Sequence, residues 1–355
     1  MEYKPLKIGN LTARLPLVQG GMGVGISLSR LAGAVAKEGG IGIISTAQIG
    51  FRRAEFDNQP IEANLAAIPE ELAAARAIAP EGVIGFNIMA ATKHCEEYVR
   101  AAAKAGADII ISGAGLPVDF PRYIKGFSTK LAPIVSSVKA AALICKLWDR
   151  RYQVAPDMVV IEGPEAGGHL GFSEEEAKSL TKKDFEAEIL KIIEEVKKFA
   201  VKYDKEIPVI VAGGIYDGED VRYVIEDLAA DGVQVSTRFV TTEECDAPLS
   251  YKQAYLTAGK DDIIITKSPV GMPGRAIKNA FLEKLEKGSR RVTKCHQCLE
   301  KCQPQNIPYC ITDALVNAAR GNVEEALLFC GSNAYRSQEM ETVPAVINDL
   351  FPAAL

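Results

Sequence analysis

Residues 207–215 read Ile-Pro-Val-Ile-Val-Ala-Gly-Gly-Ile, a short apolar run that ends in two glycines. An uninterrupted apolar run of this length is typical of a β-strand that is buried on both faces, as in a parallel sheet covered by helices. The glycines at its end allow a phosphate to approach backbone N–H groups, and a following helix adds a favourable field for an anion. The segment therefore predicts a parallel α/β fold with a phosphate site at the carboxyl end of this strand.

Similar apolar runs occur at intervals through the first 240 residues, and helix-like segments separate them. The eight runs cover residues 15–19, 41–45, 83–87, 108–112, 131–136, 158–162, 208–212 and 232–236. Eight βα units in succession are what a TIM barrel requires. An open doubly wound sheet would hold its ligand at one crevice, whereas the candidate site residues here follow five of the runs. We therefore predict an α/β fold, a (β/α)8 TIM barrel over residues 1–240.

The clearest of the predicted helices covers residues 182–203, where apolar residues recur every three or four positions among Lys and Glu. That spacing is typical of an amphipathic helix lying on a sheet. Pro69 suits the first turn of another helix, which would run to about Ala79. After about Val240 the βα pattern gives way to helical stretches at 248–258, 276–286, 312–320 and 344–350. Residues 241–355 are therefore predicted to form a C-terminal helical, cysteine-containing cap packed on the barrel.

The 355-residue chain carries a net charge of −5, and 48% of its residues are hydrophobic. Nucleic-acid-binding proteins usually carry a basic face, so this charge argues against that class. The sequence shows no run of about 18 apolar residues and no signal-peptide pattern. We expect a cytoplasmic protein with a small-molecule partner and with neither a nucleic acid nor a membrane partner. Whether it forms a homodimer stays open.

Two glycine-rich loops are candidate cofactor sites. The last predicted strand ends in Ser236-Thr237, which offer donors one βα unit after Gly213-Gly214. In TIM barrels the loops after strands 7 and 8 often share a phosphate site, so the pair favours phosphate binding over a plain glycine turn. Residues 20–25 hold four glycines, but their spacing does not fit the dinucleotide fingerprint G-x-G-x-x-G. A close approach to a flat aromatic ring explains them, and a tight turn is the alternative.

A histidine follows the sixth predicted strand, in Glu162-Gly-Pro-Glu-Ala-Gly-Gly-His-Leu-Gly171. Histidine titrates near neutral pH, which suits a general acid or base at the catalytic end of a barrel. A lone histidine is usually structural, but the surrounding glycines favour a catalytic role for His169. The Pro- and Gly-rich segment 267–275 either closes over a ligand or only caps the fold.

Four of the eight cysteines lie in one stretch, at Cys295, Cys298, Cys302 and Cys310. Thiolates at such positions can hold zinc or an iron–sulfur cluster. The stretch lacks the two C-x2-C pairs of the strong metal patterns. Free thiols are therefore favoured, and the four cysteines are weak candidate metal ligands.

Five motifs occur in barrel order: Gln19-Gly-Gly-Met22, Gly85-Phe-Asn87, Glu165-Ala-Gly-Gly-His-Leu-Gly171, Ala212-Gly-Gly-Ile215 and Ser236-Thr-Arg-Phe239. Together they resemble the nitronate monooxygenases, formerly called 2-nitropropane dioxygenases, over roughly residues 4–285. The flavin-dependent enoyl-ACP reductases belong to the same superfamily. One departure is Ser236, which stands where the family usually has glycine. A serine is tolerated there if its φ is negative.

The resemblance implies a non-covalent FMN and a set of residues around it. It places Gly21, Met22 and Asn87 along the flavin, and Gly167 and Gly168 beside it. It assigns the phosphate to Ala212, Gly213, Gly214, Ser236 and Thr237. His169 becomes the active-site histidine, a base or a hydrogen-bonding partner for the substrate.

The resemblance also implies a reaction, the oxidation of alkyl nitronates by O2 to a carbonyl compound and nitrite. Residues 329–336 resemble a subgroup described as nitronate monooxygenase-like, which favours this activity. One alternative is a reductase of an enoyl thioester or a quinone, with NAD(P)H as electron donor. A more distant alternative is a barrel that binds a phosphate ligand and has no redox role.

Overall fold

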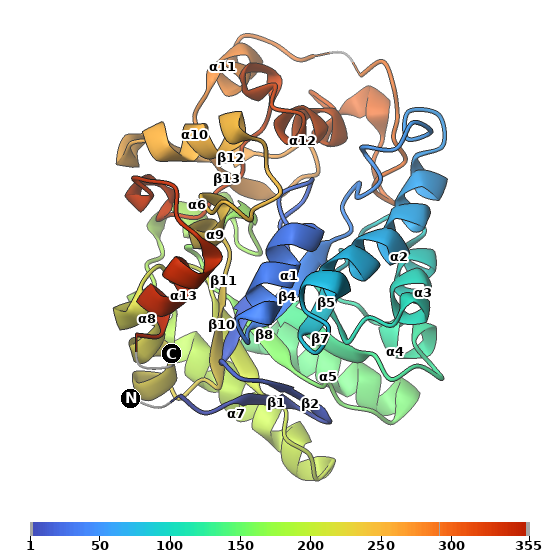
Figure 1. Cartoon of the computed structure of the whole chain (residues 1–355), viewed down its shortest axis with the longest axis vertical. Coiled ribbons are helices and arrows are strands. Elements are labelled where there is room, and N and C mark those ends of the chain that lie inside the picture. The colour runs from blue at the N-terminus through green and yellow to red at the C-terminus, as the bar shows by residue number, and fades with distance from the viewer. Residues whose placement is uncertain (1–2, 291, 353–355) are drawn as a thin grey trace.

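The computed structural model describes residues 3–290 and 292–352, and its centre is a closed barrel of eight parallel strands (Figure 1). The strands are β3 (Leu17–Gln19), β4 (Ile41–Ser45), β5 (Val83–Asn87), β6 (Ile109–Ser112), β7 (Lys130–Val135), β8 (Val159–Glu162), β10 (Val209–Ala212) and β11 (Gly232–Val235). Their order around the barrel is their order in the chain, and β11 pairs with β3 to close the ring. The predicted TIM barrel is confirmed, and each of the eight predicted segments contains a strand.

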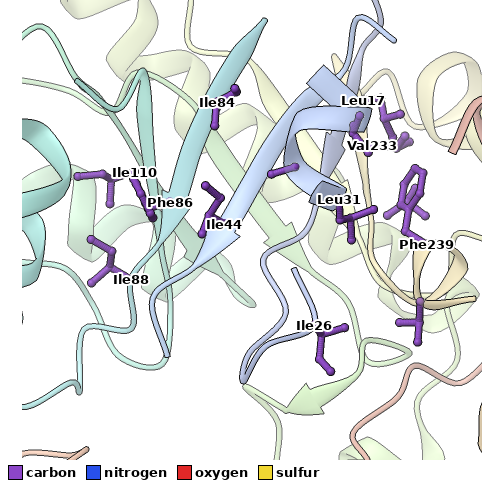
Figure 2. Close-up of a cluster of buried hydrophobic side chains, with 14 of the residues drawn as sticks. Leu17, Ile26, Leu31, Ile44, Ile84, Phe86, Ile88, Ile110, Val233 and Phe239 are labelled. Carbon is purple, nitrogen blue, oxygen red and sulfur yellow. The ribbon is translucent and has the colours of Figure 1, made fainter. Parts of the chain in front are cut away.

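Alternate residues of each strand belong to two different hydrophobic clusters. In β6, Ile109 and Ile111 belong to the cluster inside the barrel, whereas Ile110 belongs to the cluster between strands and helices. Figure 2 shows part of this outer cluster, where Ile44, Phe86 and Ile110 come from three neighbouring strands. Because both faces are covered, the strands need apolar residues at almost every position.

Helices surround the barrel between the strands. They are α1 (Ser29–Lys37), α2 (Pro60–Ile78), α3 (Cys95–Ala105), α4 (Phe120–Tyr123), α5 (Val138–Tyr152), α6 (Glu174–Ser179), α7 (Glu186–Lys202) and α8 (Gly218–Arg222), which a π-helical turn extends over Tyr223–Asp227. Short 3-10 turns cover Lys183–Phe185, Lys260–Asp262, Pro304–Asn306, Val323–Glu325 and Ala334–Arg336. No helix in the described part of the chain has the length and apolar content needed to cross a membrane.

The start predicted for the second helix is wrong. Pro69 lies inside α2, which begins nine residues earlier, and Pro60 occupies its first turn. A proline at the first helical position suits either residue, so the local signal does not distinguish them. The earlier start is set by packing, because Ala63 and Ala67 are buried and α2 packs against α1.

A β-hairpin and a cap cover the two ends of the barrel (Figure 1). β1 (Leu6–Ile8) pairs with β2 (Leu11–Ala13), and their buried residues join the cluster inside the barrel. At the other end lie the helices α10 (Leu249–Thr257), α11 (Ala280–Glu286) and α12 (Ile311–Ala319). The cap therefore sits over the carboxyl ends of the strands, where TIM barrels carry their active sites.

The cap also contains a β-hairpin that the sequence analysis did not predict. β12 (Ile263–Lys267) and β13 (Pro273–Ile277) form a three-stranded antiparallel sheet with β9 (Gly168–His169), which comes from the loop after β8. The chain then returns to the barrel. Its last helix, α13 (Val343–Leu350), packs against α1, α8 and the short α9 (Thr237–Val240), and so takes the place of the barrel's eighth helix.

Candidate active site

A cavity of about 1110 Å³ lies between the carboxyl ends of the barrel strands and the cap. All eleven residues predicted for catalysis or cofactor binding line it: Gly21, Met22, Asn87, Gly167, Gly168, His169, Ala212, Gly213, Gly214, Ser236 and Thr237. They come from β3, β5, β8, β10 and β11 or from the loops that follow these strands. The structure thus brings the predicted residues together, while their individual roles stay predictions.

The paired glycines after β10 have backbone conformations that favour glycine. Gly213 has φ +95° and Gly214 has φ +80°. A Cβ added to Gly213 would lie 3.0 Å from the backbone N of Ala166, and one added to Gly214 would lie 2.3 Å from Glu165 Oε2. Side chains at both positions are therefore strained and obstructed, so the chain turns here as bare backbone at the cavity surface.

Two hydroxyl side chains stand beside these glycines. Ser236 has φ −123°, so the expectation of a negative φ is confirmed. Thr237 Oγ1 accepts a hydrogen bond of 2.9 Å from Gly331 N–H, which leaves its own hydrogen to donate. Asn333 Nδ2 donates to the carbonyl oxygen of Gly214 at 2.9 Å and fixes this turn. Residues 331–333 belong to the C-terminal region 241–355, so the barrel and this region together build this end of the cavity.

The loop after β3 lies close against its neighbours. A Cβ on Gly20 would lie 2.1 Å from Ser236 Oγ, and one on Gly21 would lie 2.3 Å from Asn87 Cβ. The loop is closed by Met22 N–H, which donates to Ser27 Oγ at 2.8 Å. We call Gly20, Gly21, Gly213 and Gly214 the glycine floor of the cavity.

FMN is the group that the sequence predicts at this cavity, and the residues present fit it. A phosphate needs hydrogen-bond donors and close access to backbone, which Ser236, Thr237 and the turn at Gly213-Gly214 offer. A flat aromatic ring needs a floor without side chains, which Gly20 and Gly21 provide. The cavity also has room for such a cofactor, because its volume of about 1110 Å³ slightly exceeds the roughly 300–1,000 Å³ of usual ligand pockets.

His169 is held by the cap hairpin. Its Nε2 lies 2.7 Å from Ser268 Oγ, in the turn between β12 and β13. The edge of its ring meets Phe329, with 4.9 Å between ring centroids. Burial lowers the pKa of His169 to about 4, so the ring is neutral at neutral pH. Ser268 Oγ accepts a hydrogen bond of 3.4 Å from Val270 N–H, which leaves its own hydrogen to donate to Nε2. With Nε2 as the acceptor, the neutral ring carries its proton on Nδ1.

Arg275, on β13, fixes the loop that carries His169. Its Nη1 donates to the carbonyl oxygens of Pro164, at 2.9 Å, and Ala166, and its Nη2 donates to that of Ala177 at 3.1 Å. The side chain is buried and donates to three backbone carbonyl oxygens, so it acts as a hydrogen-bonded strut between cap and barrel. At the start of the same loop, burial raises the pKa of the Glu162 carboxyl to about 7.

The sequence analysis gave no role to Glu162, Ser268, Arg275, Phe329 or Asn333. For Glu162 a signal was present, because an acidic residue closes an otherwise apolar strand. Ser268 and Arg275 lie in the Pro- and Gly-rich segment 267–275, for which the sequence allows two interpretations: a loop that closes over a ligand, or a cap of the fold without ligand contact. Phe329 and Asn333 act through contacts with residues more than a hundred positions away, and nothing in their local sequence announces these contacts.

The four clustered cysteines have different surroundings in the structure. Cys298 and Cys302 line the main cavity, whereas Cys310 lines a smaller pocket and Cys295 is exposed. Among residues 3–290 and 292–352, no three His, Cys, Asp or Glu side chains come close enough to hold a metal ion.

Comparison with known proteins settles the family. A family model described as nitronate monooxygenase matches residues 4–353. The chain belongs to this family. The predicted resemblance is thereby confirmed, and it extends through the cap. As a member of the family, the protein is an oxidoreductase.

Individual relatives of this family member are distant and differ in their names. A probable nitronate monooxygenase of Staphylococcus saprophyticus is 26% identical, over 98% of this chain and 97% of the relative. A (3aS,4S,5R,7aS)-5-hydroxy-7a-methyl-1-oxo-octahydro-1H-indene-4-carboxyl-CoA dehydrogenase of Mycobacterium tuberculosis is 28% identical, over 78% of this chain and 66% of that one. The solved structure of FabK from Thermotoga maritima is similar in fold, with a TM-score of 0.72 at 24% identity, over 96% of this chain and 92% of that one.

Proposed function

We propose that this family member is an FMN-dependent nitronate monooxygenase that converts alkyl nitronates and O2 to a carbonyl compound and nitrite. The observation that carries the proposal is the neutral His169, held by Ser268 above the glycine floor. FMN, when bound, supplies the redox chemistry, because it accepts electrons from an organic substrate and passes them to O2. We also propose that the protein acts in the cytoplasm on a small molecule.

The hydrogen-bonding state of His169 suits a nitronate. A nitronate is already deprotonated, so its oxidation requires no strong base, and its negative charge lies on two oxygens. The neutral ring offers Nδ1–H to one of these oxygens, while Ser268 keeps Nε2 occupied. Phe329 and the hairpin limit rotation of the ring, so the donor is positioned before the substrate arrives.

The test of this function is direct. Purified protein is loaded with FMN and checked by its visible bands near roughly 370 and 450 nm, the usual positions for enzyme-bound oxidised flavin. It is then given propionate 3-nitronate or ethyl nitronate in air, without NAD(P)H, and nitrite and carbonyl product are measured. We expect nitrite well above the level produced by free FMN. Background nitrite from flavin-loaded protein would overturn the proposal.

A second candidate is an NAD(P)H-dependent reductase of an enoyl thioester or a quinone. The size of the cavity favours it, because about 1110 Å³ leaves room for a second large molecule. A relative named as a carboxyl-CoA dehydrogenase, which covers 78% of this chain, points the same way. Anaerobic mixing with NADH or NADPH separates the candidates. Rapid bleaching of the flavin supports the reductase, and an unchanged flavin spectrum excludes it.

A further inference from the structure

Residues from two hydrophobic clusters line the cavity together with His169. On the barrel side, Met22 and Leu116 are half-buried, pack on the barrel core and line the cavity. On the cap side, Val270, Leu299 and Leu315 pack on the cap's own core and line the same cavity, and Leu315 also packs on the barrel core. We call these three residues the cap wall. Each of the five side chains covers a core with one side and presents apolar surface to the cavity with the other.

The cap wall is fixed to the barrel by backbone contacts. Lys93 N–H donates to the carbonyl oxygen of Cys298 at 3.1 Å, and Glu300 N–H donates to that of Ala91 at 3.0 Å. Leu299 lies between these two bonds and forms a β-bridge with Thr92. The segment that carries Leu299 is therefore held against the loop after β5 and is a fixed part of the cavity.

The lining also includes polar side chains. Lys301, Gln303 and Asn306 line the cavity, and all three are exposed to solvent. The cavity therefore combines His169, an apolar surface and a solvent-exposed polar part. A ligand that matches this lining has a polar reacting group, which His169 contacts, and an apolar body, which covers the apolar side chains. Covering apolar surface is favourable in proportion to the area removed from water.

We infer that the slot between Met22 and Leu116 on one side and the cap wall on the other receives an unbranched hydrocarbon chain of the substrate. The enzyme then prefers medium-chain alkyl nitronates to ethyl nitronate. This inference rests on the proposed function, because it names the substrate class of the same site. Each methylene that enters such a slot raises kcat/KM about fourfold, the factor that corresponds to burial of one CH2 group.

The first experiment measures chain-length dependence. Nitronates prepared from nitroethane through 1-nitrooctane are compared by kcat/KM for nitrite release. We expect a rise of about fourfold per methylene over the first several members, then a plateau. Leu315→Trp fills the slot and lowers the octyl-to-ethyl ratio of kcat/KM at least tenfold, and Leu299→Trp tests the same wall independently. Leu190→Trp, on the exposed face of α7, keeps the wild-type ratio. A flat wild-type profile overturns the inference.

The second experiment needs no turnover. Straight-chain carboxylates from butanoate to decanoate share the planar, anionic XO2 group of a nitronate, and calorimetry gives their Kd for the FMN-loaded protein. We expect Kd to fall about fourfold per methylene and Leu315→Trp to remove this gain. If no nitronate yields nitrite while carboxylates show this dependence, the proposed function fails and the slot stands. Equal affinity for butanoate and decanoate overturns the slot, whatever the activity.

Discussion

The glycine floor and the cap wall line one cavity, but they are built in opposite ways. On the floor, an added Cβ would lie 2.1 Å from Ser236 Oγ at Gly20 and 2.3 Å from Asn87 Cβ at Gly21. The wall consists of half-buried side chains such as Leu299 and Leu315, which have open cavity on one side. The floor therefore tolerates no enlargement, whereas the side chains of the wall can change size on the side that faces the cavity. Substitutions in the cap wall can therefore change which substrate fits the cavity while the cofactor site stays the same.

The largest expected effect comes from a substitution that adds a methyl group to the glycine floor. In Gly213→Ala the new side chain combines a φ of +95° with contacts of 3.0 Å to Ala166 N and Gly163 O. Strain and overpacking together cost about 4 kcal/mol. Because the turn at the cavity surface must shift to relieve these contacts, we expect the phosphate-binding backbone to move and FMN affinity to fall at least tenfold, equivalent to about 1.4 kcal/mol of binding energy. The Kd is measured by quenching of FMN fluorescence.

A matched control separates strain from obstruction. Gly126 has φ +93°, but a Cβ added there meets nothing within 4 Å. Gly126→Ala therefore carries a similar backbone strain at a site away from the cavity, and we expect it to leave FMN affinity unchanged. If both variants bind FMN like the wild type, Gly213 does not belong to the phosphate site.

The next largest effect is expected at Arg275, which connects the cap to the barrel. Arg275→Met removes the hydrogen bonds to Pro164, Ala166 and Ala177 and leaves their carbonyl groups without these donors. We expect the free energy of unfolding to fall by about 3 kcal/mol, measured by urea denaturation. Arg100→Met is the control, because Arg100 is exposed and pairs only with Glu96 one helical turn away. Surface pairs contribute about 0–1 kcal/mol, so an equal loss in both variants contradicts the strut.

Glu162 belongs to the barrel and His169 contacts the cap, and burial shifts their pKa values in opposite directions. The pKa of Glu162 rises from 4.5 to about 7, so the folded protein keeps a proton that the unfolded chain loses. Stability therefore falls as pH rises from about 4.5 to 7. The pKa of His169 drops from 6.5 to about 4, so its contribution to stability rises with pH between these values. Each slope is about 1.4 kcal/mol per pH unit, and the two nearly cancel.

When one of the two groups is replaced, the pH dependence that the other contributes to the free energy of unfolding becomes measurable. Between pH 4.5 and 6.5, the unfolding free energy of Glu162→Gln should rise relative to wild type by up to about 1.4 kcal/mol per pH unit. That of His169→Asn should fall by the same amount per pH unit. Urea denaturation of the flavin-free protein at three pH values measures both, and the double variant should run parallel to wild type. Single variants that also run parallel to wild type would show that neither pKa is shifted.

The contrast between floor and wall also explains what the sequence predicts. The barrel strands are buried on both faces, so segments such as 208–212 are apolar at every position and are visible without any partner. The glycine floor can be predicted for a similar reason, because the positive φ angles at Gly213 and Gly214 favour glycine at these two positions. Burial of a strand and a positive φ at a turn both act on the residues of that same segment, so they can be recognised in its sequence. Most of the barrel and of the glycine floor is determined in this way.

The wall depends on contacts between distant segments. β12 is only partly buried, and β13 pairs on its other side with β9, a strand of two residues about a hundred positions earlier. α13 looks like any short amphipathic helix, and its place on the barrel follows from packing against α1 and α8. The same holds for Leu299, whose position depends on Thr92. None of these pairings follows from periodicity or composition.

The smallest expected effect tests whether the cap orients the chemistry without holding the cofactor. Ser268→Ala removes the hydroxyl at 2.7 Å from His169 Nε2 and so removes the preference for a proton on Nδ1. A hydrogen bond of this kind contributes about 1 kcal/mol, so kcat/KM for a nitronate should fall about five- to tenfold. FMN affinity should not change, because within the described residues Ser268 forms its hydrogen bonds with His169 and with its own hairpin turn, at Val270, Gly271 and Met272, rather than with the glycine floor. Ser179→Ala, which removes an exposed hydroxyl bonded to Glu175 on α6, should change neither quantity. If Ser268→Ala weakens FMN binding as much as turnover, the hairpin supports the floor itself, and the separation between a fixed cofactor half and an adjustable substrate half fails at His169.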